Sequence, residues 1–189
     1  MIEKDFVPSA YPKEIIAGAV RWKAPSNIAL VKYWGKKAHQ IPANPSLSFT
    51  LSACATTTTL KFQKLDKPAK DFQFDFIFEG KDKEDFKPKM ITFFERIESY
   101  LPFLRDYHFT IISANSFPHS SGIASSASSM AALSLCLVDM EREMDPDMTP
   151  DFFDKKASFL ARLGSGSASR SISGTIVQWG DHSETEGSS

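Results

Sequence analysis

Three short segments of the sequence combine glycine, hydroxyl and cationic residues in an order suited to binding phosphate groups. The first, residues 24–37, reads Ala-Pro-Ser-Asn-Ile-Ala-Leu-Val-Lys-Tyr-Trp-Gly-Lys-Lys. It carries three lysines within six residues, with Tyr33 and Trp34 between them, and Gly35 allows a sharp backbone turn before Lys36. Two or more ammonium groups beside a phenol suit a diphosphate. The alternative is a solvated lysine face with an aromatic anchor.

The second segment, residues 117–130, places small and hydroxyl residues between a predicted strand and a predicted helix. The first turn of a helix presents unpaired N–H groups and a positive dipole end, and Gly122 would let a phosphate approach the backbone. The segment has neither a Walker A Gly-Lys-Ser/Thr nor a Rossmann GxGxxG. Taken alone, it could equally be a serine-rich helix cap. Its candidate nucleotide contacts are Ser120, Ser121, Gly122, Ala124, Ser125, Ser126 and Ala127.

The third segment, residues 162–174, reads Arg-Leu-Gly-Ser-Gly-Ser-Ala-Ser-Arg-Ser-Ile-Ser-Gly. Glycines and hydroxyls ahead of Arg170 can form an anion-binding nest, and a guanidinium can clamp a carboxylate or phosphate through two parallel hydrogen bonds. Alone, this composition also fits a flexible linker. Finding all three segments in one chain favours a joint anion site. The candidate contacts here are Ser165, Gly166, Ser167, Ala168, Ser169 and Arg170.

Composition and charge restrict the classes of protein to consider. The 189 residues are 42% hydrophobic and 24% charged, which is typical of a globular protein with room for one full domain and part of another. A net charge of −1 provides no global field for nucleic acid or an anionic membrane. The most apolar run, residues 130–138, is too short to cross a bilayer, and the start lacks a signal-peptide pattern. A cytoplasmic enzyme is the simplest interpretation.

The cysteines and histidines do not suggest a metal centre. Cys54 and Cys136 belong to no zinc-ligand spacing, and we expect both to be buried small hydrophobic residues. The four histidines are scattered along the chain, without the i, i+4 pairing of a helical metal site.

Strand patterns dominate the first half of the chain and helical patterns the second. The strands that β-branched and aromatic residues predict are 19–24, 46–52, 56–62, 72–78, 108–114 and 173–179. In 72–78 the phenylalanines recur with period two and should face one core. Helices are predicted after Pro88, over 125–142, and between the N-cap Thr149 and the stop at Gly164. Strands followed by helices indicate an α+β fold.

Together, the runs at residues 24–36, 118–127 and 164–171 resemble the mevalonate diphosphate decarboxylase family of the GHMP kinase superfamily. The Ser/Gly loop is shared by the superfamily, whereas Lys-Tyr-Trp-Gly-Lys and Gly-Ser-Gly-Ser-Ala-x-Arg-Ser are more specific to the decarboxylases. The resemblance implies an N-terminal domain like the second domain of ribosomal protein S5, over residues 1–180. It also implies that residues 181–189 start a truncated C-terminal region.

The resemblance implies a carboxy-lyase of the mevalonate pathway, which serves isoprenoid biosynthesis. In the family, ATP phosphorylates the 3-hydroxyl of mevalonate 5-diphosphate, and loss of that phosphate with CO2 yields isopentenyl diphosphate. Lys32, Asn27 and Arg170 would line the reacting centre, with Arg170 on the substrate carboxylate. Tyr33, Trp34, Gly35, Lys36 and residues 165–170 would contact the substrate, together with Lys87 or Lys89. The Ser/Gly segment would hold ATP, with Ser126 near Mg²⁺.

Several alternatives remain open at this stage. The protein could be a GHMP small-molecule kinase that stops after phosphate transfer, a phosphomevalonate decarboxylase, or a non-catalytic binding module. The resemblance also implies a homodimer when full length. In the family the catalytic aspartate belongs to the C-terminal domain, so we expect these 189 residues alone to be inactive.

Overall fold

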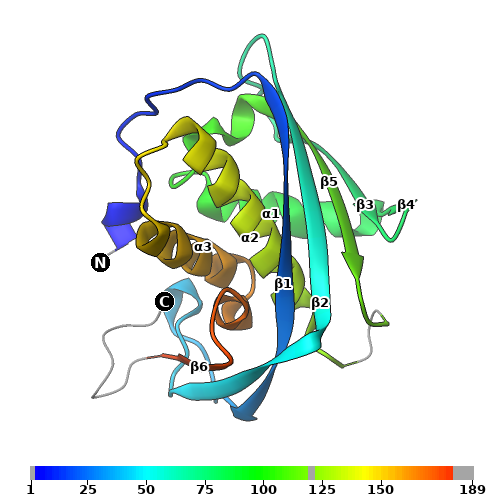
Figure 1. Cartoon of the computed structure of the whole chain (residues 1–189), viewed down its shortest axis with the longest axis vertical. Coiled ribbons are helices and arrows are strands. Elements are labelled where there is room, and N and C mark those ends of the chain that lie inside the picture. The colour runs from blue at the N-terminus through cyan, green and yellow to red at the C-terminus, as the bar shows by residue number, and fades with distance from the viewer. Residues whose placement is uncertain (1–2, 119–121, 181–189) are drawn as a thin grey trace.

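The computed structural model describes residues 3–118 and 122–180, which form one mixed sheet with helices against it (Figure 1). The sheet order is β1-β2-β5-β3-β4, with β6 also paired to β2. All pairs are antiparallel except β3 with β5. The strands are β1 (Ala17–Val31), β2 (Ser46–Lys64), β3 (Gln73–Phe78), β4 (Lys81–Asp82), β5 (Tyr107–Asn115) and β6 (Ile176–Trp179). The α+β fold class is therefore confirmed.

Three α-helices lie on one side of the sheet, with α2 packed directly against β1 and β2 (Figure 1). They are α1 (Lys87–Ile97), α2 (Ser125–Met144) and α3 (Pro150–Gly164). The 3₁₀ helices are η1 (Glu3–Phe6), η2 (Ala38–Gln40), η3 (Glu84–Phe86), η4 (Pro102–Arg105) and η5 (Gly166–Ser171). Within the described residues, no helix is long and apolar enough to span a membrane.

The two strands predicted at 46–52 and 56–62 are one long strand, β2. The small residues between them suggested a break, but β2 pairs with β1 on both sides of an irregularity. There the register jumps, because Pro25 lies opposite Ala55 while the next residue, Ser26, lies opposite Leu51. The extra residues of β2 are absorbed locally, as in a bulge, and the hairpin continues. β1 is accordingly longer than the predicted strand 19–24.

The phenylalanine pattern of β3 builds one side of the core, as predicted. Phe74, Phe76 and Phe78 are buried, and the ring of Phe74 lies edge-on to Phe94 of α1 at 5.3 Å between centroids. The helix predicted after Pro88 is α1, and it ends at Ile97. After it, Pro102 begins η4, since a proline at the first turn of a helix lacks only an N–H that would be unpaired anyway.

Helix α3 begins as predicted and ends for a different reason. The hydroxyl of Thr149 accepts a hydrogen bond from the Phe152 N–H at 3.2 Å, and Pro150 is the first helical residue. Gly164 is the last helical residue, but its backbone is not left-handed. A Cβ on Gly164 would lie 2.9 Å from Met130 Sδ and 3.0 Å from the Phe93 ring. Close packing, rather than a left-handed turn, therefore accounts for this glycine.

The two cysteines differ in burial. Cys136 on α2 is fully buried, and its thiol donates to the Thr58 carbonyl at 3.3 Å. Burial raises the pKa of Cys136 to about 12, so the thiol stays protonated at neutral pH. Cys54 is only half-buried in the irregular part of β2, because the bulge turns that region towards solvent, and the prediction that it is buried is wrong.

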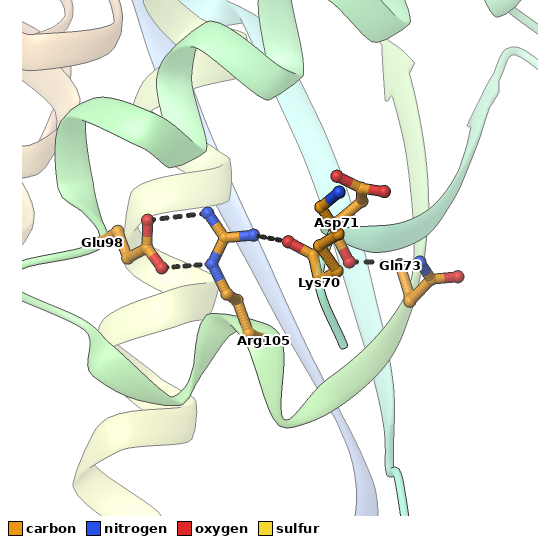
Figure 2. Close-up of polar contacts among 5 residues, drawn as sticks. All are labelled: Lys70, Asp71, Gln73, Glu98 and Arg105. Atoms are coloured by element: carbon orange, nitrogen blue, oxygen red, sulfur yellow. Dashed lines mark hydrogen bonds and ion pairs between the residues drawn. The ribbon is translucent and has the colours of Figure 1, made fainter. Parts of the chain in front are cut away.

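One end of the sheet is held by Arg105, which precedes β5 (Figure 2). Its guanidinium forms a two-pronged contact with the Glu98 carboxylate and donates to the Lys70 carbonyl. It also lies 4.3 Å from the centre of the Phe72 ring. These contacts hold the segment between β2 and β3 in place, at the C-terminal end of β2. The segments with candidate chemistry gather at the other end.

Candidate functional site

Arg170 is the most unusual side chain of the third segment, because its guanidinium is almost fully buried. Only 3% of the residue is exposed, and Nη1 donates to the Ser46 hydroxyl at 2.6 Å. Among the described residues, no carboxylate forms an ion pair with it, and its Nε has no hydrogen-bond partner. Burial lowers the pKa of Arg170, while nearby Tyr33 opposes the shift. A guanidinium nevertheless stays charged at neutral pH.

Trp179 of β6 connects Arg170 to the first segment. Its ring lies 5.4 Å from the Arg170 guanidinium carbon and 4.9 Å from the Tyr33 ring, which meets it edge-on at 78°. A Cβ on Gly166 would lie 2.6 Å from the same indole. Tyr33 of the first segment and Arg170 of the third therefore contact the same indole.

Two adjacent residues of β1 join all three segments. The Ser26 hydroxyl donates to the Ile123 carbonyl at 2.6 Å, which ties β1 to the loop before α2. The Asn27 amide donates to the Ser167 carbonyl at 3.1 Å and to the Ser171 hydroxyl at 2.7 Å, which ties β1 to η5. Both side chains are buried, so these bonds are shielded from water.

The loop before α2 presents backbone suited to an anion. Gly122 has a φ of +78°, and a Cβ there would have nothing within 4 Å, so the backbone is open to an approaching group. Ala124 is also left-handed and gives α2 no side-chain cap. Among the described residues, the N–H groups of Ser125 and Ser126 are thus left for a ligand or water, whereas the Ala127 N–H donates to the Ala124 carbonyl at 2.9 Å. The predicted contacts Ser120 and Ser121 lie outside the described residues.

A cavity of about 260 Å³ opens beside this helix start, between the sheet, α1 and α2. Phenylalanine, methionine and aliphatic side chains make up about half of its lining. The polar lining residues are Thr58, Lys89, Ser113, Ser125, Ser126 and Ser129. An apolar slot next to a helix N-terminus has the form of a site for a flat, uncharged ring that carries phosphates. Its apolar lining includes Phe76, Phe78, Phe86, Met90, Ile111 and Met130.

The lysine-rich turn is anchored by backbone and amide contacts. Asn44 accepts from the Trp34 N–H at 2.7 Å and donates to the Lys32 carbonyl at 3.2 Å. Lys36 donates to the Gln40 side chain at 2.6 Å and lies 5.5 Å from the Tyr33 ring centre. The Lys32 side chain is exposed, and Trp34 is 90% exposed. These cations are accessible to a soluble ligand.

Other predicted site residues point inwards. Ala168 is fully buried in the core cluster, and the Ser169 hydroxyl donates to the Gly166 carbonyl at 3.1 Å. Residues 166–171 form a 3₁₀ helix rather than an open loop, and β6 starts only at Ile176, since Gly174 turns with a φ of +87°. Any ligand contact from Ala168 or Ser169 would use backbone atoms.

A magnesium ion suits the chemistry of Ser126, because hydroxyl oxygen is a hard ligand. Among residues 3–118 and 122–180, no cluster of three or more acidic, histidine or cysteine side chains could hold a metal alone. Magnesium commonly binds through one or two protein oxygens together with substrate phosphates. The described residues therefore fit an ion that arrives with a nucleotide.

Comparison with known proteins accounts for this set of segments. Residues 24–189 match the family model described as diphosphomevalonate decarboxylase-like N-terminal domain. The chain belongs to this family. The diphosphomevalonate decarboxylase ERG19 of Gibberella zeae is 36% identical over 175 residues, which cover 87% of this chain and 44% of that protein.

Solved structures of mevalonate diphosphate decarboxylases share the fold of this chain. Mevalonate diphosphate decarboxylase from Staphylococcus aureus has a TM-score of 0.70 and 34% identity, covering 87% of this chain and 46% of that one. A structure described as MDDEF in complex with MVAPP, AMPPCP and magnesium has a TM-score of 0.66 and 34% identity, with the same coverage. The chain spans less than half the length of these relatives.

Three polar or aromatic residues of this decarboxylase-family site were missed by the sequence interpretation. Ser26 and Ser46 each sit in a strand, where a buried serine looks like filler, and Trp179 looks like an ordinary strand aromatic. The one signal available was the position of Ser26 directly before Asn27 inside the first motif. Ser46 is more than a hundred residues away from Arg170 in the sequence, and Trp179 is separated from it by a stretch of irregular chain. No local sequence pattern predicts either contact.

Proposed function

We propose that the protein containing this domain uses ATP to convert mevalonate 5-diphosphate to isopentenyl diphosphate, ADP, phosphate and CO2. The observation that carries the proposal is the meeting of Tyr33 and Arg170 at Trp179, with Asn27 bonded to the same η5 segment. A charged guanidinium without a carboxylate partner, beside accessible lysines, suits a ligand with a carboxylate at one end and phosphates at the other. Family membership supports the same substrate.

In the proposed complex, Arg170 binds the carboxylate that leaves as CO2, and Lys32 and Asn27 lie near the reacting hydroxyl. Tyr33, Lys36 and the Ser165–Arg170 segment would hold the rest of the substrate. Such a site accelerates phosphate transfer mainly by positioning and by neutralising charge. The open cations of the lysine turn and the polar η5 segment provide both.

The nucleotide would occupy the opposite side of β1. Its base would fill the apolar cavity beside α2, and its phosphates would lie over Gly122 and the N–H groups of Ser125 and Ser126, with Ala127 alongside. Mg²⁺ would accompany the phosphates near Ser126. Lys87 or Lys89 was predicted to contact the substrate. Lys89 instead lines this proposed nucleotide cavity, and Lys87 is paired with Glu84 at 2.8 Å.

The test is an assay of the full-length protein with MgATP and either mevalonate 5-diphosphate or mevalonate 5-phosphate. We expect equal amounts of ADP and CO2, formed faster with the diphosphate. Release of ADP without CO2 would identify a kinase, and preference for the monophosphate would identify a phosphomevalonate decarboxylase. Ligand binding without turnover would indicate a binding module. The 189 residues alone should release no CO2, and the cytoplasmic location and homodimer remain predictions.

A further inference from the structure

The buried guanidinium of Arg170 poses an electrostatic problem that its hydrogen bonds do not solve. A buried cation is ordinarily stabilised by a carboxylate, since losing its hydration is costly. Within residues 3–118 and 122–180, Arg170 has instead one bond to the Ser46 hydroxyl, and that hydroxyl donates onward to the Val31 carbonyl at 2.6 Å. A neutral hydroxyl offsets only part of the charge.

The indole of Trp179 is a further neighbour of the guanidinium. Trp179 is 1% exposed, and its ring lies 5.4 Å from the Arg170 guanidinium carbon, within the range of a cation–π interaction. Tryptophan has the most effective ring for this interaction, and removal of water strengthens it. Gly166 leaves room for the indole, because a Cβ there would lie 2.6 Å from it.

We propose that Trp179 is a positioning residue that holds the Arg170 guanidinium in place and leaves its remaining N–H groups for an anionic group of the substrate. A carboxylate in its place would neutralise the cation and compete with the substrate for its donors. An aromatic face stabilises the charge without taking its N–H groups. The same ring meets Tyr33 edge-on at 4.9 Å, so it also fixes the distance between the two substrate-binding segments.

The identity of the anion in this inference rests on the proposed function. A double-mutant cycle can test whether Trp179 acts through Arg170. Three single variants of the full-length protein are needed: Trp179→Leu, Trp179→Phe and Arg170→Met. Two double variants then combine each tryptophan substitution with Arg170→Met. Affinity for mevalonate 5-diphosphate is measured by calorimetry. Trp179→Leu should weaken binding about tenfold, and Trp179→Phe less, because phenylalanine keeps a weaker aromatic face. Both losses should be much smaller when Arg170 is already methionine, because only the contact of the ring with Tyr33 is then left to lose.

Phe153→Leu is the matched control, since it removes another buried ring that lies 4.6 Å from an arginine, Arg142. It should lower the unfolding temperature about as much as Trp179→Leu and leave the affinity unchanged. A purely structural role for Trp179 would instead give equal losses of affinity in both Arg170 backgrounds, which would overturn the proposal. If Trp179→Leu does not fold, Trp179→Phe supplies the cycle.

A second readout needs no substrate. The Nε–H of Arg170 is buried, so its NMR signal should exchange slowly with solvent and should disappear in Arg170→Met. Trp179→Leu should shift this signal and speed its exchange, whereas Phe153→Leu should not. An unchanged signal would refute the positioning role. If the wild-type protein does not bind mevalonate 5-diphosphate, the proposed function fails, and this readout still decides the role of Trp179.

Discussion

Arg170 and Lys156 are both buried cations, and the domain stabilises them in different ways. Lys156 pairs with the Glu141 carboxylate at 2.5 Å, deep between two helices. Arg170 has a serine hydroxyl and an indole instead of a carboxylate. The paired lysine has its charge balanced inside the fold. The unpaired arginine keeps a charge that a bound anion can balance, and this distinguishes a candidate ligand-binding residue from a structural one.

Replacing Arg170 by methionine should therefore affect stability and function in opposite directions. An apolar side chain of similar length removes a buried charge that has no carboxylate partner among the described residues, so the free energy of unfolding should stay the same or rise. Loss of the guanidinium should lower turnover in the full-length protein by about 10²-fold or more. Thermal unfolding and CO2 release measure the two effects. A strong loss of stability would mean that Arg170 is chiefly structural.

At the scale of elements, helices α2 and α3 are joined by a buried polar cluster rather than by apolar packing alone. Glu141 of α2 accepts from Lys156 of α3 and from the Tyr11 hydroxyl, at 2.5 and 2.8 Å, on the same oxygen. Burial raises the pKa of Glu141, which Lys156 opposes, and burial lowers the pKa of Lys156, which Glu141 opposes. Each charge is stabilised by the other, so the packing of α2 against α3 depends on this ion pair.

Lys156→Met should destabilise the domain by about 3–5 kcal/mol at neutral pH, because it leaves Glu141 charged and buried without its cation. Adding Glu141→Leu should recover much of this loss, since both charges are then gone. Urea unfolding of the single and double variants is the measurement. A double variant less stable than Lys156→Met would show that the pair is not the cause.

The same variant should show a characteristic pH dependence. Without Lys156, the pKa of Glu141 in the folded state lies still further above its unfolded value, so folding favours the protonated acid. Stability is then greatest at acid pH and falls as the pH rises through the raised folded pKa. The deficit of Lys156→Met relative to wild type should shrink on lowering the pH from neutral to the ordinary range of a glutamate, about 4.3. A constant deficit would contradict this account.

For the whole molecule, the long β1–β2 hairpin separates a structural end from a functional end. Arg105 fixes the sheet near the C-terminus of β2, whereas β6, η5 and the loop before α2 gather near its N-terminus (Figures 1 and 2). The irregularity at Pro25 places Ser26 and Asn27 between η5 and the loop before α2. The hairpin therefore sets the distance between the proposed nucleotide and substrate sites.

Ser26→Ala tests this coupling. It removes the donor to the Ile123 carbonyl, a part-buried hydrogen bond, which should cost about 0.5–1.5 kcal/mol and loosen the loop over the proposed nucleotide phosphates. In the full-length protein, affinity for ATP should fall several-fold more than affinity for mevalonate 5-diphosphate. Ser134→Ala is the control, because among the described residues the buried Ser134 hydroxyl has no partner to lose. Equal effects of the two substitutions on ATP affinity would argue against the role of Ser26.

The sequence by itself determined the features that depend on neighbouring residues. The phenylalanine alternation of β3, the start of α3 at Thr149 and the three motifs that carry the family resemblance were readable because period, capping and motif composition involve only a few neighbouring residues. Tertiary structure alone decided that Trp179 lies between Tyr33 and Arg170, that Ser46 binds the guanidinium, and that the small residues of β2 form a bulge instead of a turn. Strand register and packing across the sheet produce these contacts, and both depend on residues far apart in the chain.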